Sequence, residues 1–335
     1  MTYRTALRAM FALTLGLFLS AAAHAQLFRT YIAPDGNDSN PCTLAAPCRL
    51  LPAALATVID GGEIWMLGSA NYNTGPVNIA KSVTILAVPG ALGSVVALGG
   101  NAINIATANV KVSLRNLVIV PFVGGGGTNG IFMTAGASLT VENCLIANLP
   151  GTGIIANGVM NVLVTDSTVR GNGNNGLLFQ NGTRATVTRT TVSRNNSDGI
   201  FVRGSTASTT TADIADSTMS SNSYGVYAYS DNAGAVVKVS VRDSRAVGNV
   251  NTGITADSTA GAPVTVSASN NIISNNNTGI YAQSPGARVW ASGNTVSDNT
   301  VGLYNFAAVF ESAGDNAVRN NTTSTNGTIT TVPKI

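Results

Sequence analysis

The stretch VTDSTVRGNGNNGLLF, Val164 to Phe179, decides the fold, because it returns 23 residues later as VTRTTVSRNNSDGIFV, Val187 to Val202. The second copy keeps the apolar, Asn and Gly positions of the first. Internal repeats with a period of about 20–50 residues are typical of solenoids, in which successive turns of the chain stack on one another. The repeat therefore predicts an elongated, stacked architecture.

A glycine followed by an aliphatic residue marks each turn of the repeat. Successive glycines are 23 to 28 residues apart, which indicates turns of constant core and variable loops. We expect the glycines to supply tight turns and the aliphatic residues to face inward. The pairs are Gly130–Ile131, Gly153–Ile154, Gly176–Leu177, Gly199–Ile200, Gly225–Val226, Gly253–Ile254, Gly279–Ile280 and Gly302–Leu303.

Two further columns accompany the glycines. The second inward column is Ile146, Val169, Val192, Met219, Ala246, Ile273, Val296 and Val318. Three residues beyond it, seven turns carry Asn172, Asn195, Asn222, Asn249, Asn276, Asn299 and Asn321. Buried amides in register can bond the turn above and the turn below, so we expect an asparagine ladder.

These columns predict an all-β fold, a single-stranded right-handed parallel β-helix of about 10 coils stacked about 4.8 Å apart. A leucine-rich horseshoe is the competing solenoid, but its Leu-based consensus is missing. We place the β-helix at residues 63–322, after an N-terminal cap at residues 26–62 with a short capping helix within Leu50 to Ile59. Residues 323–335 are polar and are expected to form an irregular tail.

Residues 1–25 have the pattern of a secretory signal peptide, with Arg4 and Arg8, an apolar run and the small-residue site AHA. A transmembrane anchor is the alternative, but the run is shorter than the roughly 20 residues that span a bilayer. We therefore expect a secreted protein, periplasmic or extracellular, without a transmembrane segment after cleavage.

The three cysteines separate into a pair and a single residue. Cys42 and Cys48 lie six apart, and in an oxidising compartment they are expected to form a disulfide, with metal binding as the weaker alternative. Cys144 aligns with Ser167, Thr190, Ser217 and Ser244 of later repeats, which favours a buried structural thiol over a reactive one.

The composition excludes several classes of function. The formal net charge is +3, from 18 basic and 15 acidic residues, so bulk charge attracts neither nucleic acid nor an anionic membrane. His24 is the only histidine and falls within the expected signal peptide. A Ser/His/Asp triad is therefore excluded from the mature chain.

The motifs YIAPDGNDSNP, GGEIWML and DSTVRGN…NGLLF resemble those of the pectate-lyase-like right-handed β-helix proteins of secreted bacterial origin. The resemblance covers nearly the whole mature chain and implies the fold, but no single activity. Enzymes of this superfamily act on acidic polysaccharides, through calcium-binding carboxylates and a basic residue or through clustered Asp residues with a His. Neither set transfers here, so we expect no cofactor, and calcium only if the protein is a lyase.

Two groups of carboxylates are candidates for catalysis. Asp216 and Asp243 belong to a corner column with Asn143, Asp166, Arg189 and Asn270, and lie on neighbouring coils near the roughly 5 Å separation used by retaining glycosidases. The alternative is that Asn or Asp at this corner caps turn amides throughout the solenoid. Asp257 is the remaining candidate.

The second and fourth residues after each repeat glycine should face outward, and aromatic residues, which are scarce overall, concentrate there. We call the outward residues from Phe201 to Phe306 the aromatic strip. Aromatic faces beside hydrogen-bonding groups suit sugar rings, whereas mutual packing of the rings is the alternative. The candidate binding residues are Phe201, Arg203, Tyr227, Tyr229, Asp257, Tyr281 and Gln283.

Three hypotheses follow for function. A secreted module that binds a polysaccharide or cell-surface glycan without catalysis is favoured, a polysaccharide lyase or glycoside hydrolase comes second, and a purely structural or adhesive rod comes third. The sequence leaves the oligomeric state open.

Overall fold

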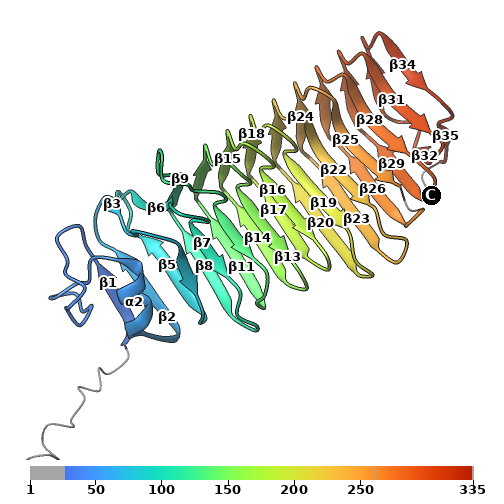
Figure 1. The fold of residues 1–335 in the computed structure, drawn as a ribbon. Coiled ribbons are helices and arrows are strands. Elements are labelled where there is room, and N and C mark those ends of the chain that lie inside the picture. Colours follow the sequence, from blue (N-terminus) through green and yellow to red (C-terminus); the bar gives the residue numbers. More distant parts are fainter. Residues whose placement is uncertain (1–26, 260, 334–335) are drawn as a thin grey trace, which may run out of the picture.

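The computed structural model describes residues 27–259 and 261–333. The chain winds into one elongated solenoid whose strands form three long sheets running side by side along the axis (Figure 1). All strand pairs within the three sheets are parallel. The expected signal peptide, residues 1–25, lies outside the described residues.

The sheets are named A, B and C. Sheet A contains β1 (Leu27–Ile32), β2 (Val58–Met66), β5 (Val83–Ala87), β8 (Lys111–Arg115), β11 (Ser138–Glu142), β14 (Asn161–Thr165), β17 (Arg184–Thr188), β20 (Thr209–Ala215), β23 (Val236–Arg242), β26 (Val264–Ser269), β29 (Ala287–Ser292), β32 (Val309–Ser312) and β35 (Thr330–Thr331). Sheet B contains β3 (Ala70–Asn71), β6 (Gly93–Ala97), β9 (Leu117–Pro121), β12 (Leu145–Ala147), β15 (Thr168–Arg170), β18 (Thr191–Ser193), β21 (Thr218–Ser220), β24 (Arg245–Val247), β27 (Ile272–Ser274), β30 (Thr295–Ser297) and β33 (Ala317–Arg319). Sheet C contains β4 (Val77–Ile79), β7 (Ile103–Ile105), β10 (Ile131–Met133), β13 (Ile154–Asn157), β16 (Leu177–Gln180), β19 (Ile200–Gly204), β22 (Tyr224–Ser230), β25 (Thr252–Ser258), β28 (Thr278–Gln283), β31 (Val301–Phe306) and β34 (Thr323–Asn326).

Each coil contributes one strand to sheet C, then one to sheet A, then one to sheet B, as in β16, β17 and β18. The predicted all-β right-handed parallel β-helix is confirmed, with 11 strands in each of sheets B and C where about 10 coils were expected. The three sheets give the solenoid three outer faces. A binding or catalytic site must therefore lie on one of these faces or at a corner between two of them.

The core is a continuous column of aliphatic side chains along the axis. Ile154 pairs in register with Ile131 and Leu177, and the glycine-following column continues in this way to Leu303. The second predicted column is also in register, with Val192 between Val169 and Met219. Burying these side chains on every coil is the main stabilising term, at about 25 cal/mol per Å² of apolar surface.

The predicted asparagine ladder is confirmed. The Oδ1 of each ladder Asn accepts hydrogen bonds from the main-chain N–H and the Nδ2 of the ladder Asn one coil earlier, as Asn195 does from Asn172 at 3.2 and 2.9 Å. The ladder begins at the Leu149 N–H, which donates to Asn172 Oδ1, and continues to Asn321. Each amide thus satisfies corner groups that water cannot reach.

A second ladder follows the corner between sheets A and B. The Cys144 N–H donates to Ser167 Oγ at 3.1 Å, and the series continues through Thr190, Ser217 and Ser244 to Asn271. Cys144 itself accepts the Leu117 N–H at 3.4 Å, and burial raises the pKa of its thiol to about 11. The expectation of a buried, structural Cys144 agrees with this placement.

The repeat glycines are required for space and not for a left-handed backbone, which corrects our expectation of tight turns. Their φ angles are not positive. A Cβ on Gly176 would lie 2.7 Å from Gly199 O and 2.8 Å from Asn195 Nδ2, and would clash with the Val192 side chain. The ladder and the second inward column therefore pack directly against the bare glycine backbone.

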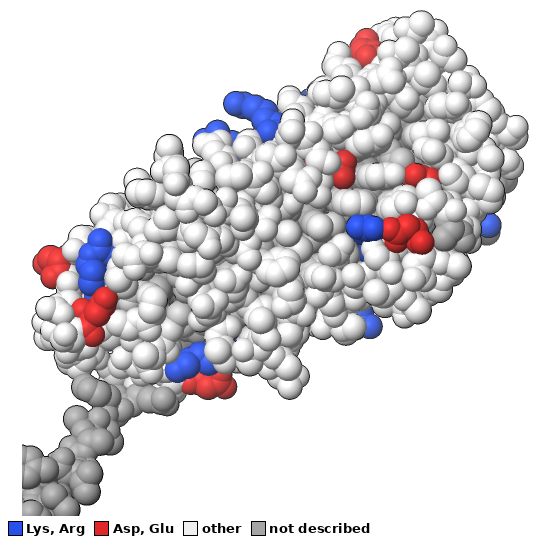
Figure 2. Space-filling view, viewed as in Figure 1, with Lys and Arg blue, Asp and Glu red and all other residues white. Residues whose placement is uncertain are grey.

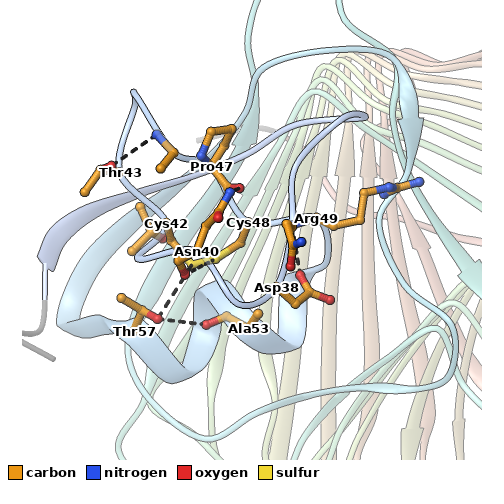
Figure 3. The surroundings of a disulfide bond; sticks show 12 residues. Asp38, Asn40, Cys42, Thr43, Pro47, Cys48, Arg49, Ala53 and Thr57 are labelled. Carbon is orange, nitrogen blue, oxygen red and sulfur yellow. Dashed lines mark hydrogen bonds between the residues drawn. A yellow bond between two sulfur atoms is a disulfide. The ribbon is translucent and has the colours of Figure 1, made fainter. Parts of the chain in front are cut away.

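The N-terminal end carries a loop closed by the predicted Cys42–Cys48 disulfide, beside the short helix α2 (Leu51–Thr57) (Figure 3). The Asp38 carboxylate accepts the N–H groups of Arg49 and Leu50, both at 2.8 Å, just before the helix begins. The buried side of α2 packs on β1, β2 and β4 at the first coil. A helix at this place covers strand edges that a solenoid would otherwise expose.

The structure differs from our expectation at both ends of the solenoid. The segment assigned to the N-terminal cap supplies β1 and most of β2, which are the first strands of sheet A. The polar segment expected to be an irregular tail forms β34 and β35, which pair with β31 and β32. Its Thr residues favour strands, and polar side chains suit a terminal coil that faces solvent.

Candidate functional site

The aromatic strip lies on the outer face of sheet C, on strands β19, β22, β25, β28 and β31. Its first row is formed by residues paired in register, Phe201, Tyr227, Thr255, Tyr281 and Tyr304. Its second row is Arg203, Tyr229, Asp257, Gln283 and Phe306. The inward neighbours of these residues fill the core, so the alternation predicted from the sequence holds from the residue after each repeat glycine onward.

The rings form two stacked groups. The rings of Phe201 and Tyr227 are nearly parallel, with an interplanar angle of 9° and centroids 5.2 Å apart, and the Tyr229 ring lies 5.6 Å from that of Tyr227. Tyr281 and Tyr304 stack separately at 4.7 Å. Between the two groups lies β25, which carries no aromatic residue.

Asp257 is buried in the gap between the two groups, with 5% of its surface exposed. Its carboxylate accepts hydrogen bonds from the Tyr227 hydroxyl at 2.9 Å and the Ser284 hydroxyl at 3.0 Å. Burial, with the negative charge of Asp257, raises the pKa of Tyr227 above its ordinary range. The Tyr227 hydroxyl is therefore a fixed donor that holds its ring over β25.

Thr255 lies next to Asp257 in the chain and is 1% exposed. Its hydroxyl oxygen has no hydrogen-bond partner among the described residues. Arg203 pairs with Asp231, which leaves the Arg203 Nε without a partner. Both atoms are buried, so neither faces a ligand on the surface, and the cost of leaving each one unpaired falls on the folded state.

Two residues of this face escaped the sequence analysis. The ring of Tyr224 stacks on that of Tyr227 at 4.9 Å, and Asp198 lies one coil earlier in the same position relative to the repeat glycine. If inward and outward residues alternated strictly, Tyr224 and Asp198 would both face inward. The repeat glycine that follows each of them interrupts this alternation, so both lie on the outer side. Inspection of the residue before each repeat glycine would have found them.

Asp198 is 5% exposed and has no basic partner. Burial raises the pKa of its carboxyl to about 6, although a hydrogen bond with Ser197 opposes the shift. Such a carboxyl changes protonation state near neutral pH. Asp198 lies two residues before β19 of sheet C, and its raised pKa is typical of a general acid.

Asp216 and Asp243 lie elsewhere, at the corner between sheets A and B. Both have left-handed backbones, with φ of 49° and 51°, as do Asn143, Asp166, Arg189 and Asn270 at the same corner. Short polar side chains tolerate this conformation best, which accounts for the column. Asp243 faces Arg242 at 3.7 Å. The structure therefore does not bring this pair together with Asp257.

Charged side chains are sparse on the face of the molecule in Figure 2, and several lie in groups where both signs meet. No group of three His, Cys, Asp or Glu residues in the described ranges is arranged to hold a metal ion. Within residues 27–259 and 261–333, no helix is long and apolar enough to cross a membrane.

The comparisons with known proteins agree on the fold. A family model described as a right handed beta helix region matches residues 80–238. Among solved structures, pectate lyase Pel9A is 18% identical with a TM-score of 0.54, and the match covers 84% of this chain and 76% of that chain. The Azotobacter vinelandii mannuronan C-5 epimerase AlgE4 A-module is 14% identical with a TM-score of 0.54, and the match covers 82% of this chain and 91% of that chain. The Dettilon tailspike protein is 13% identical with a TM-score of 0.59, and the match covers 90% of this chain and 68% of that chain. No curated protein matches the sequence.

Proposed function

We propose that this chain, which folds as a right-handed parallel β-helix, is a secreted module that binds a polysaccharide or cell-surface glycan along the aromatic strip. The observation that carries the proposal is the pair of ring groups on sheet C, separated by the small, polar side chains of β25. Rings that only filled a core would face inward, whereas these lie on an outer face.

The arrangement fits a sugar chain laid along the solenoid axis. From β22 to β28 is two coils, or about 10 Å, so one extended chain can contact both ring groups. Each sugar presents an apolar C–H face to a ring and hydroxyl groups to its side. Gln283, which is half-buried at the surface of the strip, is a polar group in reach of those hydroxyls.

The comparisons support a glycan partner at the level of the fold. A pectate lyase and a mannuronan epimerase are named for polysaccharides and share the architecture. At 14–18% identity they do not identify the glycan. Secretion rests on the pattern of residues 1–25 and is supported by the disulfide, because disulfides persist in oxidising compartments.

Catalysis by a lyase or glycoside hydrolase is the second candidate, and Asp198 favours it. This carboxyl, with its pKa near 6, lies two residues before β19 of sheet C, whereas Asp216 and Asp243 lie at the corner between sheets A and B. Incubation of the protein with each bound polysaccharide, with and without calcium, tests it. New ultraviolet absorbance of unsaturated sugars indicates a lyase, new reducing ends alone indicate a hydrolase, and neither leaves a binding module.

Binding is tested by affinity electrophoresis through gels that contain a panel of neutral and acidic polysaccharides. On any polymer that retards the wild type, Phe306→Ala should reduce the retardation by about threefold or more, since a stacked ring contributes about 0.5–1.5 kcal/mol. Phe122→Ala is the matched control, because Phe122 and Phe306 are 55% and 56% exposed and Phe122 lies off the strip. Equal losses in the two variants, or no retardation on any polymer, would rule the proposal out and favour a structural rod.

A further inference from the structure

A long groove of the described residues lies on sheet A and not on the aromatic strip. It has a volume of about 910 Å³ and runs across the outer face of β11, β14, β17, β20, β23 and β26. It shares Ser138 and Thr140 with a smaller hollow that extends it toward β2. The two hollows together form an open channel parallel to the solenoid axis, which we call the sheet A groove.

The floor of the sheet A groove is a row of mostly hydroxyl side chains, paired in register from coil to coil. Its members are Thr84, Ser113, Thr140, Leu163, Thr186, Asp213, Ser240 and Ser267. Trp290 continues the row at the next strand. The Ser and Thr hydroxyls of this floor can both donate and accept hydrogen bonds, and neighbouring coils are about 4.8 Å apart.

One wall of the groove carries a row of cations, which we call the basic row. Lys111, Arg184, Lys238 and Arg288 occupy one position of the register and are all exposed. Arg184, Lys238 and Arg288 are each two coils apart, which places their Cα atoms at steps of about 10 Å. Lys111 lies three coils before Arg184, at about 14 Å.

Three members of the basic row lack a carboxylate partner among the described residues: Lys111, Arg184 and Lys238. Arginines on the opposite wall are different, because Arg115 pairs with Glu142 at 2.8 Å and Arg242 with Asp213 at 3.6 Å. The only carboxylate on the groove lining is thus already countered by Arg242. The wall of unpaired cations gives the groove a positive field although the whole chain is nearly neutral.

We propose that the sheet A groove binds an acidic polysaccharide, with the sugar chain along the axis and its negative groups against the basic row. A sugar residue of an extended chain is about as long as one coil step, so cations on alternate coils match a polymer with an acidic group on alternate sugars. This site is on a different sheet from the aromatic strip, and its argument does not depend on the function proposed there.

A polysaccharide fits this groove better than a nucleic acid does. Base stacking needs aromatic side chains, and the floor from Thr84 to Ser267 contains none. A single-stranded nucleic acid also carries a phosphate on every nucleotide, whereas the unpaired cations stand on alternate coils or further apart. The hydroxyl floor instead suits the hydroxyl-rich faces of sugars.

The test measures binding of the full chain to hyaluronan, which has a carboxylate on alternate sugars, by biolayer interferometry at low and raised salt. Sulfated chondroitin, uncharged dextran and single-stranded DNA are the comparison probes. The wild type should bind both acidic polysaccharides and not dextran, and salt should weaken the binding. Binding of hyaluronan assigns carboxylate recognition, whereas binding of chondroitin sulfate alone assigns sulfate recognition at the same row.

The variant Arg184→Gln/Lys238→Gln should weaken that binding by about fivefold or more, because it removes two charge-assisted contacts. Arg194→Gln/Arg245→Gln is the matched control, since these exposed, unpaired arginines lie on the sheet B side and the charge change is the same. Equal losses in both double variants, preference for DNA, or no binding to either acidic polymer would overturn the proposal.

Discussion

Removal of one asparagine from the middle of the ladder should be far more costly than removal of an exposed asparagine beside it. Asn222 Oδ1 accepts the N–H and the Nδ2 of Asn195, both at 3.0 Å, and Asn222 Nδ2 donates to Val192 O at 3.0 Å and Asn249 Oδ1 at 3.3 Å. Asn222→Ala removes all four bonds and leaves two donors of Asn195 without an acceptor. Each buried unpaired group costs about 1–3 kcal/mol, and partial relaxation brings the expected loss to about 2–4 kcal/mol.

The assay is urea unfolding of wild type and variants, followed by circular dichroism, with the loss taken from midpoint and slope. Asn196→Ala is the control, because Asn196 follows the ladder residue Asn195 but is exposed and makes no side-chain hydrogen bond. Asn321→Ala should cost less than Asn222→Ala, because Asn321 belongs to the last coil and is partly exposed. A midpoint for Asn222→Ala equal to that of Asn196→Ala would refute the ladder as a source of stability.

Three further predictions concern buried groups. Cys144→Ser should change stability by less than about 1 kcal/mol, because Ser occupies the same ladder position in other coils, and Cys144 should be alkylated at pH 8 only after unfolding. Gly176→Ala should lower stability by about 1–3 kcal/mol through overpacking, whereas Gly75→Ala, with nothing within 4 Å of its added Cβ, should be neutral in the same urea assay. The Asp198 carboxyl has a pKa near 6 in the folded state, above its unfolded value, so the folded state binds this proton more tightly. The free energy of unfolding should therefore fall by about 2–3 kcal/mol as the pH rises from about 4 to 6. Asp198→Asn should remove that part of the pH dependence, and an unchanged slope would contradict a buried, unpaired carboxyl.

Much of the fold could be predicted from the sequence, because a solenoid repeats one local rule. The columns around Gly176, Val192 and Asn195 recur in successive coils, so one sequence contains several examples of each position. The same repetition allowed the outward rows that include Tyr227 and Tyr281 to be predicted. Errors concentrate where the rule is not repeated, at the first and last coils, since their pairing partners exist on one side only.

Parts of both candidate sites could not be predicted, because they depend on distances between side chains. The outward position of Asp198 and Tyr224 follows from broken alternation at a glycine, which period-two counting misses. The partnerships of Asp257 with Tyr227 and Ser284 depend on rotamers. The sheet A groove was missed because its cations are spread over alternate coils and no single repeat contains the row.

The central claim is that the aromatic strip binds a glycan. A crystal structure of the protein with a bound oligosaccharide tests it most directly, and the oligosaccharide should come from the polymer whose binding Phe306→Ala weakens most. The account predicts sugar rings stacked on Tyr281 and Tyr304, with hydroxyl groups within hydrogen-bond distance of Gln283. Sugar bound only outside sheet C, or a strip that remains empty at saturating oligosaccharide, would contradict it.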